Sequence, residues 1–189
     1  MVKFFLIFLS LINFSKNSMA NDNNKYETAI IAGGCFWGVE NLFSKFVGVT
    51  NTEVGYIGSN YKDPTYDVVK LGLSGHAESV KIIFDPNKTS YEKILKFFFK
   101  IHDPTQLNKQ QNDIGTQYRS EIFYLNEKQK EVAENLIKKL DQSGVFKNKI
   151  VTKLSKAGIF YVAEEYHQNY LKKNPNGYNC HYIRKDLEF

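Results

Sequence analysis

The stretch Gly-Gly-Cys-Phe-Trp-Gly at residues 33–38 most constrains the fold, because it joins a strand pattern directly to a helix pattern. The apolar run 29–32 leads into the two glycines, and apolar side chains then recur at spacings of three and four up to Phe46. This order places Cys35 at or near a helix N-terminus, where unpaired N–H groups and the helix dipole favour a thiolate. We therefore hypothesise that Cys35 is a nucleophile.

Two other interpretations of the cysteines stay open at this point. The chain has only Cys35 and Cys180. A free cysteine is more often a small buried hydrophobe than a reactive group. In an exported protein, two cysteines form a static disulfide by default, and they can equally form a redox couple. Their spacing in the sequence does not choose between these interpretations.

The first twenty residues have the pattern of a secretory signal peptide. Lys3 supplies a positive start, residues 4–14 are nearly all apolar, and Ser18-Met19-Ala20 offers small residues for cleavage. The apolar run is too short for a membrane-spanning helix, which needs about 20 residues. We expect export, to the periplasm, with an uncleaved membrane anchor as the alternative. Residues 21–189 are then one domain, since no linker or internal repeat divides them.

Charge and aromatic content indicate a solvated surface and a lined pocket. The net charge is +5, and removal of Lys3 and Lys16 with the leader lowers it to +3. Lysines are scattered among acids and form no block, so we expect no nucleic-acid partner. Aromatic residues make up 15% of the chain, and many tyrosines lie in polar, glycine-containing segments. These tyrosines are expected to line a pocket.

The periodicity predicts an α+β fold of the ferredoxin-like, split βαβ type, a sandwich with appended helices and an irregular C-terminal tail. A capping box that starts at Thr89 marks the beginning of the second helix. The segment 55–75 is rich in glycine, tyrosine and turn residues, and the segment 102–117, which has no apolar periodicity, is interpreted as a functional loop. Strands are expected at 26–32, 49–56, 77–84, 119–125 and 149–154, and helices at 35–46, 90–101, 126–140 and 163–173.

Several short motifs together resemble the peptide methionine sulfoxide reductases of the A type, over residues 28–182. Each motif alone is weak, but their joint order makes chance agreement implausible. They are Gly-Cys-Phe-Trp-Gly (34–38), Gly-Tyr-Ile-Gly (55–58), Pro-Thr-Tyr (64–66), Gly-His-Ala-Glu (75–78), His-Asp-Pro-Thr (102–105), Asn-Asp-Ile-Gly-Thr-Gln-Tyr-Arg-Ser (112–120) and His-Gln-Asn-Tyr-Leu (167–171). Ser59, Ser74 and Gln111 depart from the family pattern, at loop or neighbouring positions.

The resemblance implies thiol-dependent reduction of methionine-S-sulfoxide, free and in proteins, as a repair of oxidative damage. Cys35 matches the nucleophile, which becomes a sulfenic acid. Glu78 matches the acid that donates a proton to the sulfoxide oxygen, which requires a raised pKa. Cys180 matches the resolving thiol. It would form a Cys35–Cys180 disulfide that thioredoxin or a thioredoxin-like protein reduces.

The resemblance also implies a set of residues that bind the substrate. Tyr66 and Tyr118 match tyrosines that hydrogen-bond the sulfoxide oxygen, and Asp113 matches an acid that shapes the site. Phe36 and Trp37 match an apolar slot for the S-methyl group, which aromatic faces suit. Taken singly, each of these residues has a commoner structural role as a core, turn or surface residue. A monomer without a cofactor is expected.

The histidines and cysteines also suggest two other enzyme classes. The pair His76 and Glu78 suits a zinc deaminase, but that class needs a downstream Pro-Cys-x-x-Cys, which is missing from the sequence. Histidines and cysteines show no metal-ligand spacing, so no metal is expected. His181 is interpreted as a surface residue. A cysteine-nucleophile hydrolase, with Cys35 paired to His76, His102 or His167, is the alternative function.

Overall fold

The computed structural model describes residues 25–189, and the signal peptide expected at residues 1–20 lies outside them. Within the described part, no helix is long and apolar enough to cross a membrane. The strands are β1 (Glu27–Gly33), β2 (Val49–Ile57), β3 (Ala77–Phe84), β4 (Lys109–Gln110), β5 (Asp113–Ile114), β6 (Ser120–Tyr124), β7 (Lys153–Lys156) and β8 (Tyr161–Val162). The helices are α1 (Phe36–Phe43), α2 (Tyr66–Lys70), α3 (Tyr91–Ile101), α4 (Glu127–Ser143) and α5 (Tyr170–Lys173), with a 3₁₀ turn η1 (Thr116–Tyr118).

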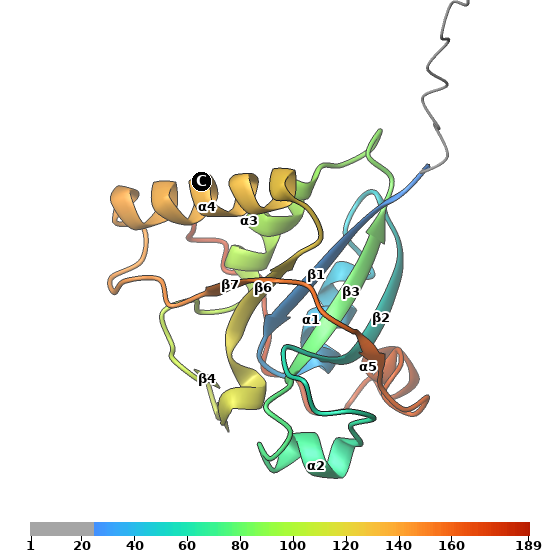
Figure 1. Cartoon of the computed structure of the whole chain (residues 1–189). Helices are drawn as coiled ribbons and strands as arrows, with labels where there is room; N and C mark the ends of the chain where they lie inside the picture. The colour runs from blue at the N-terminus through green and yellow to red at the C-terminus, as the bar shows by residue number, and fades with distance from the viewer. Residues whose placement is uncertain (1–24) are drawn as a thin grey trace, which may run out of the picture.

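A mixed sheet in the order β7-β6-β1-β3-β2-β8 forms the centre of the molecule (Figure 1). Its four middle strands are antiparallel neighbours, β1 between β6 and β3, and β3 between β1 and β2. This is the strand order of a split βαβ fold, with β7 added parallel to β6 and β8 added to β2. The predicted α+β class is confirmed.

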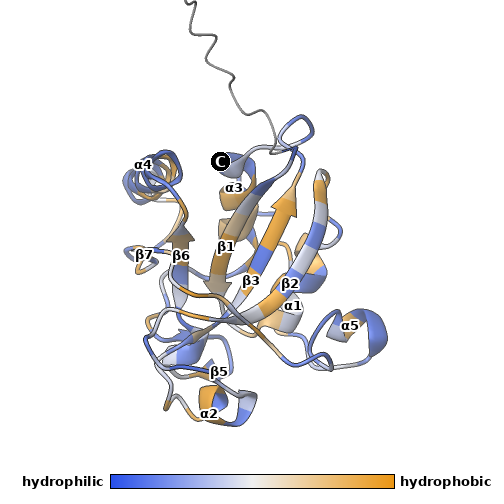
Figure 2. Ribbon diagram, turned by 45° about the vertical axis from the view of Figure 1, so that its right-hand side comes forward, coloured by the Kyte–Doolittle hydropathy of each residue, from blue (hydrophilic) through white to orange (hydrophobic). Residues whose placement is uncertain are grey.

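Alternation along the strands divides the apolar side chains between two faces of the sheet. On one face, side chains of β1 and β3 pack with those of α1 and α3 into the main core. Ile30, Ala32 and Phe123 point to the other face, where Ala157 and Phe160 cover them. These two covering residues belong to the segment between β7 and β8, which crosses in front of the sheet in Figure 1. In Figure 2 the hydrophobic colour is concentrated on β1 and β3.

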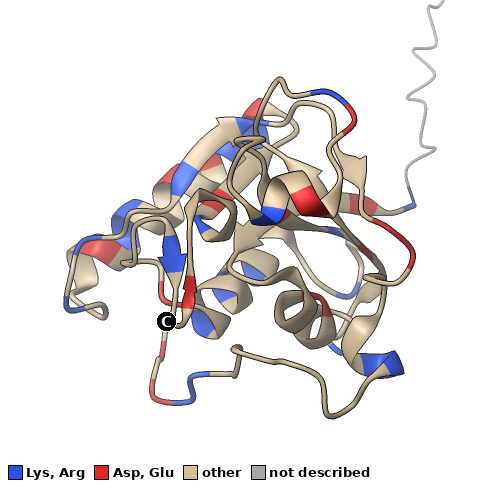
Figure 3. Ribbon diagram, turned by 90° about the horizontal axis from the view of Figure 1, so that it is seen from below, with Lys and Arg blue, Asp and Glu red and all other residues tan. Residues whose placement is uncertain are grey.

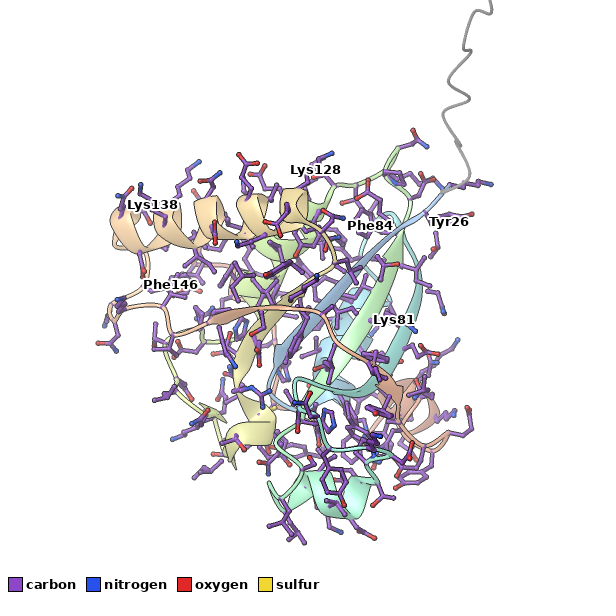
Figure 4. The ribbon with its side chains drawn as sticks, in the orientation of Figure 1. Tyr26, Lys81, Phe84, Lys128, Lys138 and Phe146 are labelled. Carbon is purple, nitrogen blue, oxygen red and sulfur yellow. The ribbon has the colours of Figure 1, made fainter. Side chains whose placement is uncertain are left out.

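The surface carries interspersed charges, as the composition indicated. Lys and Arg alternate with Asp and Glu over the ribbon in Figure 3. Lys128 and Lys138 project outward from α4, where Figure 4 labels them, and both side chains are exposed. The apolar face of α4, with Ala133, Leu136 and Leu140, is buried against the core. The helix is therefore amphipathic, as its sequence pattern predicted.

The predicted helix at 163–173 is wrong, because only α5 is helical in this segment. Side chains from the segment bind other parts of the chain. Gln168 pairs with Val54, accepting from its N–H at 2.9 Å and donating to its carbonyl oxygen at 2.9 Å. Asn169 has φ 53°, a left-handed conformation that interrupts a helix. Tertiary hydrogen bonds thus replace the helical ones.

Other boundaries differ more modestly from the prediction. α1 ends at Phe43 rather than near residue 46, and β7 starts four residues later than expected. The cap of α3 is Ser90, not Thr89, since the Ser90 hydroxyl accepts the N–H of Lys93. The capping box was therefore assigned one residue too early. Asn126 caps α4 as predicted, because its side chain accepts the N–H of Gln129. The segment 55–75, rich in turn residues, contains α2, and the segment 102–117, interpreted as a loop, contains β4, β5 and the start of η1.

Candidate active site

Cys35 occupies the N-cap of α1, directly after β1. β1 ends at the lower side of the molecule in Figure 1, where α2 also lies. Gly34 has φ +102°, which L side chains rarely adopt, so the chain turns sharply between strand and helix. The Cys35 side chain is 7% exposed. The local arrangement predicted from the sequence is confirmed.

The sequence led us to expect that the helix N-terminus favours the thiolate form of Cys35. This expectation is wrong, because the thiol form is favoured in the folded chain. Burial raises the pKa of Cys35 well above its ordinary value, and the neighbouring carboxyl of Glu78 raises it further. The backbone N–H of Trp37 acts in the opposite direction but does not outweigh these effects. Loss of hydration at a buried helix end therefore exceeds the benefit of the helix dipole. At neutral pH Cys35 holds its proton.

Glu78 lies in β3 and faces α1. Its side chain is 2% exposed, and Oε2 accepts the backbone N–H of Phe36 at 3.1 Å. Burial raises the pKa of Glu78 to about 8, with a smaller contribution from Asp113, while the Phe36 N–H lowers it. The carboxyl is therefore mostly protonated at neutral pH. This is the state that an acid must have to donate a proton to a bound oxygen.

Two tyrosines lie beside this pair of groups. Tyr66 begins α2, and Tyr118 ends η1. Burial raises the pKa of Tyr66 to about 12, and the charges of Glu78 and Cys35 act in the same direction. The pKa of Tyr118 is also raised by burial and by Glu78. Both hydroxyls therefore stay protonated at neutral pH and keep a hydrogen that they can donate.

An aromatic cluster forms the other side of the site. The indole N–H of Trp37 donates to Nδ1 of His167 at 3.0 Å. Trp37 stacks on Tyr170 with ring centroids 3.8 Å apart and an angle of 16° between the planes. Phe36 lies 5.0 Å from the His167 ring. These contacts fix the rings of two adjacent residues on α1, with Phe36 buried and Trp37 partly exposed.

Sequence reasoning missed the residues that hold this cluster in place. The carboxylate of Glu164 accepts the hydroxyl of Tyr56 at 2.7 Å and the backbone N–H of Tyr66 at 2.8 Å. Burial raises the pKa of Glu164, but these hydrogen bonds together outweigh it and lower the value. His167 and Tyr170 belong to the His-Gln-Asn-Tyr-Leu motif. The sequence suggested His167 only as a base for Cys35 in the alternative hydrolase, and it suggested no role for Tyr170.

The C-terminal tail brings Cys180 to the same site. Its Sγ lies 3.1 Å from Oδ2 of Asp113, and the Tyr178 hydroxyl donates to Oδ1 at 3.0 Å. Burial raises the pKa of Cys180 to about 12, and Asp113 adds to this, while the backbone N–H of Cys35 faces the sulfur and lowers it. Cys35 and Cys180 are both free thiols. The predicted surface position of His181 is wrong, because its side chain is 4% exposed.

The geometry gives little support to the alternative chemistries. Among residues 25–189, no three His, Cys, Asp or Glu side chains form a group that could hold a metal ion. Each histidine considered as a base for Cys35 bonds elsewhere. His76 bonds the carbonyl oxygen of Tyr61, and His102 bonds Phe98 and Ser120. His167 accepts the indole N–H described above.

Comparisons with known proteins agree with this geometry. The family model described as peptide methionine sulfoxide reductase matches residues 27–188. A relative from Nocardia farcinica with the same name is 51% identical over 158 residues, covering 84% of this chain and 91% of the relative. The reduced form of Mxr1 from Saccharomyces cerevisiae has a TM-score of 0.79 at 38% identity, over 87% of this chain and 95% of Mxr1. Methionine sulfoxide reductase A of Corynebacterium diphtheriae has a TM-score of 0.71 at 37% identity, and the match covers 83% of this chain and 79% of that reductase. The chain belongs to the peptide methionine sulfoxide reductase family.

Proposed function

We propose that this protein reduces methionine-S-sulfoxide, free and in oxidised proteins, to methionine. The observation that carries the proposal is the contact of a buried, protonated Glu78 with the first turn of α1, directly beside Cys35. Membership of the family supports the reaction class. An acid next to a thiol suits a sulfoxide, because protonation of its oxygen makes the sulfur electrophilic.

In the first step, Cys35 is the nucleophile and Glu78 is the acid. Glu78 donates its proton to the sulfoxide oxygen while Cys35 attacks the sulfur. The thiol proton of Cys35 passes to the Glu78 carboxylate, so the site exchanges no net proton with solvent. The protonated oxygen then transfers from the methionine sulfur to the sulfur of Cys35: the sulfoxide S–O bond and the transient bond between the two sulfur atoms break, and an S–O bond forms on Cys35. Methionine leaves with its sulfur reduced, and Cys35 is oxidised to a sulfenic acid. The raised pKa values of both groups support this order, because each still carries its proton when the substrate arrives.

The substrate is held by the groups around this pair. Phe36 and Trp37 form the slot for the S-methyl group, and their packing against His167 supports this role. Tyr66 and Tyr118 donate hydrogen bonds to the sulfoxide oxygen. Asp113 shapes the far side of the site. Donors aimed at the oxygen stabilise the charge that develops there, and the aromatic faces favour the apolar methyl group.

The second step uses Cys180 as the resolving thiol. It attacks the sulfenic acid on Cys35, water leaves, and a Cys35–Cys180 disulfide forms. Thioredoxin or a thioredoxin-like protein then reduces this disulfide. The yeast relative Mxr1 has been solved in complex with Trx2, which supports a reductant of this class. The approach of the Cys180 sulfur to the backbone of Cys35 supports the pairing.

The test compares the two sulfoxide epimers with the reduced full-length protein. Without an external reductant, we expect about one methionine per chain from the S epimer and the loss of both thiols. Thioredoxin, thioredoxin reductase and NADPH should then sustain turnover with free and peptide-bound sulfoxide. A hydrolase or a protein with a structural disulfide would release no methionine and keep its thiol count unchanged. Release from the R epimer alone would contradict the stereochemical assignment.

The N-terminal pattern supports export of a single domain. We propose that residues 1–20 are removed as a signal peptide and that residues 21–189 act in the periplasm as a monomer. The family model matches most of this part of the chain, which is consistent with one domain. N-terminal sequencing of protein from the native host should begin at Asn21. Protein that begins at Met1 in the cytosolic fraction would contradict export.

A further inference from the structure

The buried imidazole of His181 contacts Cys180 in a defined orientation. Its Nε2 lies 2.7 Å from the carbonyl oxygen of Gly33, and its Nδ1 lies 3.3 Å from Sγ of Cys180. A carbonyl oxygen only accepts hydrogen bonds, so Nε2 carries the ring proton. Nδ1 therefore presents its lone pair to the thiol of Cys180.

The surrounding chain is shaped to hold this ring. A Cβ atom at Gly38 would stand 2.5 Å from Nδ1 of His181, and one at Gly34 would stand 3.1 Å from its Cε1. The backbone N–H of His181 also donates to Oδ1 of Asn179 at 3.0 Å. Two glycines that flank the Cys-Phe-Trp sequence thus leave the space that His181 fills. A larger residue at position 38 would push the ring away from Cys180.

The resolving step needs a proton acceptor at this place. The pKa of Cys180 is about 12, so only about one molecule in 100,000 carries the thiolate at pH 7. The thiolate is the form that attacks a sulfenic acid. His181 is uncharged at neutral pH, because burial lowers its pKa below the ordinary value. A neutral imidazole beside the thiol can take the proton as the attack proceeds.

We propose that His181 is a catalytic general base, which deprotonates Cys180 during attack on the sulfenic acid of Cys35. This role rests on the proposed function. The proton of the Cys180 thiol passes to Nδ1, and a bond forms between the two sulfur atoms. The bond between sulfur and oxygen on Cys35 breaks, and the oxygen takes up the proton and leaves as water. The sulfur of Cys180 is oxidised and that of Cys35 is reduced, so thiol and sulfenic acid become a disulfide.

Asp113 is the other acceptor within reach of the Cys180 thiol, at 3.1 Å. Oδ1 of this carboxylate already accepts the Tyr178 hydroxyl, whereas Nδ1 of His181 has the Cys180 sulfur as its one hydrogen-bond contact within the described residues. The negative charge of Asp113 instead stabilises the imidazolium that forms on His181. The other titratable groups facing this pair are Tyr178, His102 at the end of α3, and Cys35. None of them carries a charge at neutral pH that would oppose the transfer.

The wild-type pH profile tests this role without any substitution. Reduced full-length protein is mixed with methionine-S-sulfoxide in a quenched-flow instrument, and methionine release and thiol loss are counted with time. The lag between them gives the rate constant of disulfide formation. With a neutral base beside Cys180, this constant should change less than about twofold between pH 7 and 9. Ionisation of Cys180 by solvent predicts a rise of about tenfold per pH unit instead, which would overturn the role.

The variant His181→Gln sharpens the test, because its amide can still donate to Gly33 but carries no basic nitrogen. We expect methionine release close to wild type, disulfide formation slowed by about 100-fold or more, and a rate that now rises with pH. Tyr182→Phe is the matched control, since it changes an exposed residue of the same tail and keeps His181 and the contacts of Cys180. Its profile should stay flat. If disulfide formation in His181→Gln stayed as fast as in the wild type and independent of pH, the role of His181 as a general base would be refuted. Failure of the wild type to release methionine would overturn the proposed function itself, and the base with it.

Discussion

The pKa of about 8 at Glu78 predicts how the first step depends on pH. A carboxyl with a raised pKa keeps its proton to higher pH, so about 90% of the chains carry it at pH 7 and about 10% at pH 9. The pKa of Cys35 lies above this window, so its thiol stays protonated across most of it. If the doubly protonated site is the reactive form, the rate constant of methionine release should fall about tenfold from pH 7 to pH 9.

The assay is single-turnover release of methionine from the S-sulfoxide, measured by quenched flow at saturating substrate. Glu78→Gln is the matched variant, because it keeps the side-chain size and a hydrogen-bond donor but has no proton to transfer. We expect its rate constant to be about 100- to 10,000-fold lower and flat through pH 8. A wild-type rate constant that rises through pH 8 would refute the reasoning. It would mean that ionised Glu78 first removes the proton of Cys35.

Three further predictions concern other parts of the site. Cys180→Ser should release one methionine per chain but show no cycling with thioredoxin, and full cycling would remove its resolving role. Trp37→Phe loses the hydrogen bond to His167, so KM should rise about two- to tenfold with kcat nearly unchanged. Glu40 is a buried residue of α1 whose carboxyl accepts the backbone N–H of Asn169. Burial raises its pKa to about 7, so the folded chain binds this proton more tightly than the unfolded chain, and the free energy of unfolding should fall as pH rises from 4.5 to 7. Urea unfolding at pH 5 and pH 8 measures this change, and in Glu40→Gln the part of the fall in the free energy of unfolding that Glu40 contributes should be absent.

Local patterns in the sequence predicted the fold well wherever each element follows its own periodicity. β1 is apolar over most of its seven residues, and β3 alternates over eight. In α4 the apolar face recurs from Val132 to Leu140. These elements and their order suffice for the split βαβ arrangement. The segment around Gln168 could not be predicted in this way. Its side chains bond β2, more than a hundred residues earlier, and such contacts leave no local pattern.

The candidate site was predictable mainly through motifs, and its electrostatics were not. Cys35 was identified by its position before a helix and Glu78 by the family resemblance, but the sequence could not show that burial outweighs the helix dipole at Cys35. Solvation depends on the whole fold, whereas the dipole depends on one helix. Likewise, His181 follows Cys180 in a tail without regular pattern, and only the folded chain shows that its ring lies beneath α1. The glycines at 34 and 38 are the one sequence signal for the space it occupies.

The most direct test of the central claim is to identify where the oxygen goes. Cys180→Ser protein is mixed with methionine-S-sulfoxide and dimedone, which labels sulfenic acids, and the chain is then mapped by mass spectrometry. The mechanism predicts one methionine released per chain and one dimedone adduct, on Cys35. Methionine release without an adduct on Cys35, or the same release from Cys35→Ser, would contradict it.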